Sequence, residues 1–219
     1  MDTQRGKESG YEPSGAVRHL GAADPELAAL IERVGPLRLA PPQRPEPFRA
    51  LLRAVVYQQL AGSAAGVIHA RVLALLGDAG PDPAALARVA DDALRRAGLS
   101  RNKLAALRDL ARAAQDGTLP HADALSAMPD EEIIRRLCTI RGIGRWTVEM
   151  LLIFDLGRPD VLPVRDLGVR KGFRNLRGLD ALPTPGELGS HGERWRPYRS
   201  AAAWYLWRAA EGGGPDTWS

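Results

Sequence analysis

The chain of 219 residues contains a single cysteine, Cys138. One thiol cannot form an intramolecular disulfide, and it cannot supply the several thiolates of a zinc site or an iron–sulfur cluster. The four histidines are scattered and show no metal-ligand spacing. These absences exclude a disulfide-bonded scaffold and a cysteine-held metal centre, and they favour a protein of the cell interior.

Long apolar runs are missing as well. No stretch approaches the roughly 18 apolar residues that a membrane span needs, and the first ten residues lack the apolar core of a signal peptide. We therefore expect no membrane partner, and the cytoplasm is the predicted location.

Lysine is scarce although the chain is basic. Lys7, Lys103 and Lys171 are the only lysines among 30 basic residues, and the formal net charge is +4. Arginine suits bidentate phosphate contacts, but a GC-rich genome produces the same bias. The charge permits an anionic partner without proving one.

Strand-forming residues are few, whereas alanine, leucine and arginine dominate, so helix propensity is high throughout. Helix starts are predicted where a capping residue precedes a helical pattern, in three cases with proline at the first helical position: Asp24-Pro25, Ser63, Asp82-Pro83, Ser100, Asp130 and Thr184-Pro185. The chain is predicted to be all-α with about ten helices and a flexible leader over residues 1–20.

The most informative stretch runs from Leu137 to Val148 and predicts two helices joined by a Gly142-Ile143-Gly144 turn. A glycine turn that opens a helix presents backbone N–H groups beside the positive end of the helix dipole, which can hold a phosphate. The glycines also remove the Cβ atoms that would block the approach of the phosphate. An ordinary αα-hairpin produces the same pattern.

A lone carboxylate, Asp166, follows this hairpin after Leu162-Pro163. Aspartate is a favoured helix cap, so Asp166 is predicted to begin the helix that follows. A cap position also fixes a carboxylate at a helix start, so capping and catalysis are compatible.

Four blocks that span most of residues 48–208 resemble one family in its own order. They are Val56-Tyr57-Gln58-Gln59-Leu60 with Ala64-Ala65, Leu94-Arg95-Arg96-Ala97-Gly98-Leu99-Ser100 with Lys103, the hairpin with Asp166, and Arg194-Trp195-Arg196-Pro197-Tyr198-Arg199-Ser200 with Trp204 and Trp207. The chain resembles the helix-hairpin-helix (HhH-GPD) DNA glycosylase superfamily, in particular its AlkA-like 3-methyladenine DNA glycosylase II branch.

The resemblance implies a two-lobed helical fold with a cleft between the lobes and without an N-terminal β domain. One lobe would be discontinuous, residues 21–50 plus 160–219. The other would be residues 51–159, with the helix-hairpin-helix at 131–156.

The resemblance also implies a DNA glycosylase that hydrolyses the N-glycosidic bond of alkylated bases of the 3-methyladenine and 7-methylguanine type in duplex DNA, within base excision repair. Asp166 matches the catalytic aspartate of the family. Members that also cut the strand carry a lysine two residues after the second hairpin glycine, where this chain has Trp146. The expected enzyme is therefore monofunctional, without AP-lyase activity.

The remaining site residues are assigned by the same resemblance. The base pocket would comprise Trp146, Met150, Trp207, Tyr57 and Gln58, and the wedge that fills the gap left by an everted base would be Gln59 and Leu60. An alkylated purine carries positive charge, so stacking on Trp146 would gain about 0.5–2 kcal/mol.

Phosphate contacts would come from Gly142, Ile143, Gly144, Arg145 and Thr147. The family's hairpin often holds a monovalent cation, Na⁺ or K⁺, which here would be bound by the backbone of Cys138, Ile140 and Ile143. No cofactor is expected to be required, and a monomer that binds damaged double-stranded DNA is expected. Two alternatives stay open: a non-enzymatic helix-hairpin-helix DNA-binding module, and a glycosylase for hypoxanthine or etheno lesions.

Overall fold

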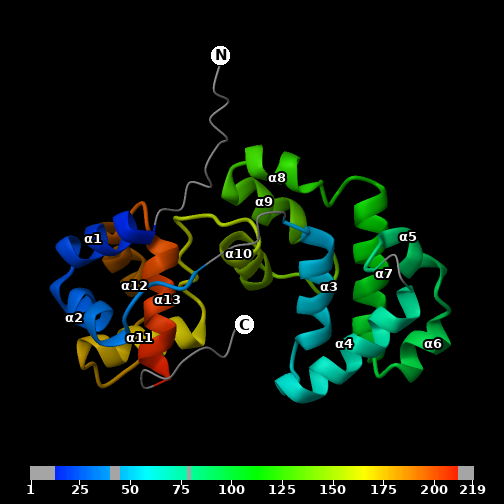
Figure 1. Ribbon diagram of the computed structural model, residues 1–219, viewed down its shortest axis with the longest axis horizontal. Coiled ribbons are helices and arrows are strands. Elements are labelled where there is room, and N and C mark those ends of the chain that lie inside the picture. The colour runs from blue at the N-terminus through cyan, green and yellow to red at the C-terminus, as the bar shows by residue number, and fades with distance from the viewer. Residues whose placement is uncertain (1–12, 40–44, 78–79, 212–219) are drawn as a thin grey trace, which may run out of the picture. The chain divides into compact units, whose positions relative to one another are not determined.

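The computed structural model describes residues 13–39, 45–77 and 80–211. This part of the chain contains thirteen α-helices and one short 3₁₀ helix and no strand (Figure 1). The predicted all-α fold is confirmed, with more helices than the ten expected. Across the same residues, none of the helices has the length and apolar character needed to cross a membrane.

The chain divides into two compact units, one continuous and one built from both ends of the chain. The boundaries lie at 42/43 and 151/152, whereas the sequence placed them at 50/51 and 159/160. The second boundary falls inside α10 (Arg145–Phe154).

The discontinuous unit contains the following elements: α1 (Pro13–Ala23), α2 (Pro25–Val34), α11 (Leu167–Arg177), α12 (Pro185–Gly192), η1 (Glu193–Trp195) and α13 (Arg199–Ala210). The continuous unit contains α3 (Pro47–Tyr57), α4 (Gly62–Leu76), α5 (Pro83–Arg88), α6 (Asp91–Arg96), α7 (Arg101–Gln115), α8 (Ala122–Ala127) and α9 (Asp130–Leu137).

The flexible leader predicted over residues 1–20 is wrong from residue 13 onward, because α1 begins at Pro13. Ala16 and Leu20 are fully buried against the rest of the discontinuous unit. Two apolar residues at i and i+4 lie on one face of a helix, and burying that face stabilises even a segment of polar and glycine-rich composition. Residues 1–12 lie outside the described part of the chain.

Most of the predicted helix starts are confirmed by the capping geometry. The side chains of Asp24, Asp82 and Ser100 each accept a hydrogen bond from the N–H three residues on, and Thr184 forms a full capping box with Glu187.

Two predicted caps are wrong. The residue before α9 is Pro129, so Asp130 lies in the first turn, where its charge still suits the helix dipole. Helix α4 begins at Gly62 after Ala61, which has no capping side chain, and Ser63 therefore lies inside the helix.

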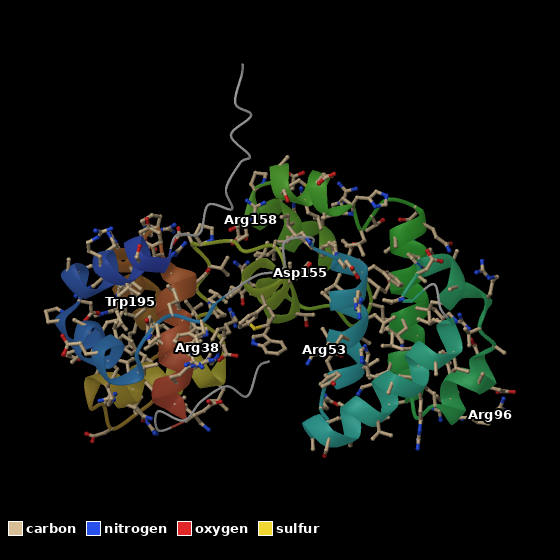
Figure 2. The ribbon with its side chains drawn as sticks, viewed as in Figure 1. Arg38, Arg53, Arg96, Asp155, Arg158 and Trp195 are labelled. Atoms are coloured by element: carbon tan, nitrogen blue, oxygen red, sulfur yellow. The ribbon has the colours of Figure 1, made fainter. Side chains whose placement is uncertain are left out.

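The discontinuous unit has a polar group at the centre of its core. Asp24 is fully buried, and its Oδ2 accepts the indole N–H of Trp195 at 2.9 Å and a hydrogen bond from His191 at 3.0 Å. Trp195 is labelled in Figure 2. Arg177 adds a charged contact to the same oxygen. A buried carboxylate is stable only with such partners, so this cluster joins the α1–α2 corner to α11, α12 and η1.

Helices α11 and α13 lie side by side and approach unusually closely (Figure 1). A Cβ atom placed on Gly172 would lie 1.8 Å from the backbone oxygen of Leu206. Glycine at this position therefore allows the two backbones to touch, and this contact sets which residues of α13 face the first turn of α11.

Candidate functional site

Asp166 occupies the N-cap of α11, as the sequence predicts. Its Oδ1 accepts the backbone N–H of Val169 at 2.7 Å and the indole N–H of Trp207 at 2.9 Å. Two donors on one oxygen fix the orientation of the carboxylate plane. The side chain is half-buried, so it is neither sealed in the core nor freely solvated.

The loop before Asp166 is held at its other end by the start of α13. The buried Ser200 hydroxyl donates to the carbonyl of Arg158 at 2.6 Å and accepts the N–H of Val161 at 3.0 Å. Arg199 donates to the side chain of Asp160 at 2.7 Å. Asp160 is thus engaged in structural ion pairs with Arg196 and Arg199.

A pocket of about 270 Å³ opens beside Asp166, between the first turns of α11 and the last turn of α13. Its lining residues are Asp166, Leu167, Gly168, Lys171, Trp207, Ala210 and Glu211. The structure therefore brings together two residues that the sequence assigned separately, the carboxylate of Asp166 and the indole of Trp207.

The position of Trp207 depends on a second glycine. A Cβ atom on Gly168 would lie 2.8 Å from Cδ1 of Trp207 and 3.1 Å from Oδ1 of Asp166. On its other side the indole packs against Phe154, with ring centroids 5.6 Å apart. Trp207 is 5% exposed, so it is a rigid wall of the pocket.

In the continuous unit, the hairpin turn after α9 has the geometry that its glycines predict. Gly142 has φ +77°, and the Ile143 side chain is buried behind the turn. Gly144 precedes α10, and its carbonyl accepts the N–H of Val148 at 3.2 Å. A Cβ on Gly144 would meet no atom within 4 Å, so the backbone there is open to an approaching group.

Two other helices of this unit hold the hairpin turn. Asp109 on α7 accepts the backbone N–H of Arg141 at 2.8 Å, and Gln58 after α3 donates to the carbonyl of Gly142 at 2.9 Å. The hydrogen bond from Arg141 and those from Arg112 lower the pKa of Asp109. Sequence reasoning missed Asp109, because its spacing to Arg112 is that of an ordinary surface ion pair.

The charged side chain of Arg145 is engaged by carboxylates. Its guanidinium pairs with Glu131 and lies 3.0 Å from Glu149, and the hydrogen bond with Glu131 raises the pKa of Arg145. Thr147 is buried, and the backbone N–H groups of Arg145 and Thr147 lie in the first turn of α10, where helices lack internal acceptors. The phosphate contacts assigned to these two residues stay a prediction, and it concerns their backbone rather than their side chains.

The predicted wedge lies on a tight turn after α3. The Leu60 N–H donates to the Tyr57 carbonyl at 3.3 Å, and Gln59 has φ +57°, a value that residues other than glycine rarely adopt. The side chains of Gln59 and Leu60 are exposed. Strained backbone of this kind concentrates at functional sites.

Tyr57 is half-buried and packs between two side chains. Arg53, labelled on α3 in Figure 2, lies over its ring at 4.4 Å from the centroid, and the His69 ring meets it edge-on with the centroids 5.9 Å apart. The remaining predicted pocket residues, Trp146 and Met150, are one turn apart on α10, and Trp146 is 40% exposed.

The predicted cation ligands are backbone carbonyls around the hairpin turn. The Ile140 carbonyl accepts the N–H of Ile143 at 3.1 Å, and a carbonyl oxygen has a second lone pair. Carbonyl oxygens suit hard cations, so the donor set fits Na⁺ or K⁺. In the described part of the chain, no group of three or more His, Cys, Asp or Glu side chains could hold a metal ion.

Comparison with known proteins identifies relatives along nearly the whole chain. The chain is 38% identical over 195 residues to DNA-3-methyladenine glycosylase 1 of Schizosaccharomyces pombe, covering 88% of this chain and 86% of the relative. It is 31% identical to DNA-3-methyladenine glycosylase 2 of Escherichia coli, covering 93% of this chain and 67% of that protein.

Solved structures agree. The 3-methyladenine DNA glycosylase of S. pombe in complex with abasic DNA matches with a TM-score of 0.82 at 37% identity, covering 92% of this chain and 100% of that one. A DNA-3-methyladenine glycosidase from Bacillus halodurans matches with a TM-score of 0.81 at 38% identity, covering 89% and 88%. The model of the HhH-GPD superfamily of base excision DNA repair proteins matches residues 52–197. The chain belongs to the HhH-GPD superfamily.

Proposed function

We propose that this protein is a monofunctional DNA glycosylase that hydrolyses the N-glycosidic bond of alkylated bases in duplex DNA. The observation that carries the proposal is the Asp166 carboxylate, which is fixed by two donors on one oxygen at the edge of a pocket walled by Trp207. The names of the relatives and the abasic DNA in the matching S. pombe structure support the same substrate class.

Cleavage of an N-glycosidic bond passes through a sugar with oxocarbenium character, as glycoside hydrolysis does. A fixed carboxylate beside the developing charge stabilises it, and the same group orients the attacking water. The water oxygen bonds to C1′, the base leaves with the electron pair of the broken bond, and the water proton passes to the carboxylate or to solvent.

Alkylated purines of the 3-methyladenine and 7-methylguanine type are good leaving groups because they carry positive charge. A site with one carboxylate therefore suffices, and no separate general acid is needed. We propose the indoles of Trp207 and Trp146 as stacking surfaces for such cationic bases, with Tyr57 and Met150 as further pocket residues.

Duplex binding is assigned to the hairpin, through the backbone N–H groups of Gly142, Gly144, Arg145 and Thr147, because the Ile143 N–H, which the resemblance also assigns to a phosphate, already donates to the Ile140 carbonyl. Na⁺ or K⁺ held by the carbonyls of Cys138, Ile140 and Ile143 would add a positive charge beside the phosphate. Gln59 and Leu60 would fill the gap that an everted base leaves. We expect the protein to act as a monomer, and the cytoplasmic location remains a prediction.

Absence of strand cleavage is a separate part of the proposal. A lyase needs an amine that forms a Schiff base with the sugar, and the hairpin position that carries this amine in the lyases is occupied by Trp146. Incubation with DNA that contains an abasic site should give no strand break and no adduct after borohydride reduction.

The test of the main proposal compares Asp166→Asn with Asp180→Asn, an exposed carboxylate of the same unit. Each protein is incubated with methylated duplex DNA, and the released bases are separated and identified. Asp166→Asn should bind the DNA normally and release base at least about a hundredfold more slowly, whereas Asp180→Asn should match the wild type. If the wild-type protein binds the DNA but releases no base, the proposal is wrong and the protein is a DNA-binding module. Preferential release of hypoxanthine or etheno bases would change the proposed substrate.

A further inference from the structure

A single side-chain hydrogen bond joins the predicted wedge to the hairpin turn. Gln58 Nε2 donates to the carbonyl of Gly142 at 2.9 Å, across 84 residues of sequence. The sequence placed Gln58 in the base pocket. The structure instead engages its amide with the backbone of the turn that is predicted to bind phosphate.

On the wedge side, Gln58 controls a strained turn. Its own N–H donates to the Ala54 carbonyl at 3.1 Å and ends α3, and its φ of −51° and ψ of 131° precede the φ of +57° at Gln59. These angles fit a type II turn, in which the second central position favours glycine. A glutamine stays in that conformation only when its surroundings hold the turn.

On the hairpin side, the acceptor is itself fixed. Gly142 packs so closely on α7 that a Cβ would lie 2.8 Å from the Cβ of Ala106, and the preceding N–H of Arg141 is bound by Asp109. Lys103 of the same helix donates to the Val56 carbonyl at 2.6 Å. Helix α7 therefore holds the hairpin turn and the end of α3, and Gln58 closes the link between them.

We propose that Gln58 is a positioning residue that joins the wedge of Gln59 and Leu60 to the hairpin. The wedge and the hairpin then act as one rigid part, so that binding of the DNA backbone and opening of the base pair occur together. The wedge must keep the base pair open against its tendency to form again. A two-residue turn without a hydrogen bond to a neighbouring segment would be displaced. The inference rests on the proposed function and assigns to Gln58 the opening step rather than contact with the base.

The test uses two isosteric variants, Gln58→Met and Gln58→Glu. Methionine keeps the length without a donor, and an ionised glutamate keeps the shape but only accepts. Gln115→Met is the matched control, because Gln115 is an exposed glutamine at the end of α7. Gln59→Ala reports the loss of the wedge itself.

Each variant is assayed under single turnover on one lesion in two duplexes. In one the lesion is paired, and in the other it faces a tetrahydrofuran abasic analogue, so no base pair has to be opened. We expect both Gln58 variants and Gln59→Ala to lose at least about tenfold in rate on the paired lesion and less than about threefold on the unpaired lesion. Binding of undamaged duplex should stay unchanged, because Asp109 still holds the hairpin.

Equal losses on both duplexes, or no loss on either, would overturn the inference, because a purely structural role does not distinguish paired from unpaired lesions. A 2-aminopurine beside the lesion reports opening without excision. If the wild type opens the duplex but releases no base, the proposed function fails, and the fluorescence of the Gln58 variants still decides the role of Gln58.

Discussion

The hydrogen bond between the Trp207 indole and Asp166 makes a quantitative prediction for Trp207→Phe. The substitution keeps an aromatic ring against Phe154 and removes the indole N–H that donates to the carboxylate from α13. The Val169 N–H remains on the same oxygen, so Asp166 stays at the helix start but loses one of the two donors that fix its plane.

A hydrogen bond to a charged group contributes about 1.5–3 kcal/mol. If the orientation it provides is needed in the transition state, base release should slow by about 10- to 150-fold, at about 1.4 kcal/mol per factor of ten. Affinity for damaged duplex should change much less, because the hairpin that is predicted to bind the backbone lies on other helices.

Trp204→Phe is the matched control. Trp204 lies one turn earlier on α13 and is 4% exposed against 5% for Trp207, so both variants remove similar buried area. Its ring faces Arg208 at 4.0 Å and is not part of the Asp166 pocket. The assay is single-turnover base release beside a binding titration for each variant, and equal rates in the two variants would refute the reasoning.

A spectroscopic measurement tests the bond directly. The indole proton of Trp207, assigned by its absence in Trp207→Phe, should move upfield in Asp166→Asn because a neutral amide is a weaker acceptor than a carboxylate. The other indole signals should stay in place. An unmoved Trp207 signal would show that the hydrogen bond is absent in solution.

Three further predictions follow from glycine packing and from the buried charges. Gly144→Ala should leave the melting temperature unchanged, because no atom lies within 4 Å of the new Cβ, yet weaken binding of damaged and undamaged duplexes alike in a salt titration; unaltered binding would count against the hairpin contact. Gly172→Ala, whose Cβ would lie 1.8 Å from the Leu206 oxygen, should cost about 3 kcal/mol or more and lower the melting temperature by several degrees, with Gly189→Ala as a tolerated control. Burial lowers the pKa of His191 below 6.5, whereas for Asp24 burial is outweighed by hydrogen bonds from His191 and Trp195 and by Arg177, so its pKa is also lowered. Both groups therefore bind protons less readily in the folded state than in the unfolded chain. The urea midpoint should be constant above pH 6.5, fall as His191 of the unfolded chain becomes protonated, and fall again below about pH 4 as Asp24 does. A midpoint independent of pH from 7 to 3 would contradict this.

The parts of the fold that sequence predicts well are those with local causes. A cap is decided within four residues, so Asp24, Asp82, Ser100 and Thr184 could be recognised from their neighbours alone. The same holds for Asp166, whose capping role needs only the N–H of Val169.

The error over α1 and the missed contacts of Gln58 and Asp109 have distant causes. Helix α1 is stabilised by burial of Ala16 and Leu20, and it packs on η1 and α13 from the far end of the chain as well as on α2, which composition does not reveal. Gln58 binds a carbonyl 84 residues away, and Asp109 binds an N–H 32 residues away. A family motif indicates that such a residue is functional, but only the structure shows which atoms it contacts.

The interrupted unit also has a consequence for synthesis on the ribosome. Helices α1 and α2 are translated before the continuous unit, yet they pack on α11, α13 and η1, which emerge only after that whole unit. Residues 43–151 can therefore reach their native contacts while the amino-terminal helices still lack partners. A ribosome stalled shortly before residue 199 would carry an exposed apolar surface around Leu20, Leu27 and Leu30, a target for chaperones and proteases.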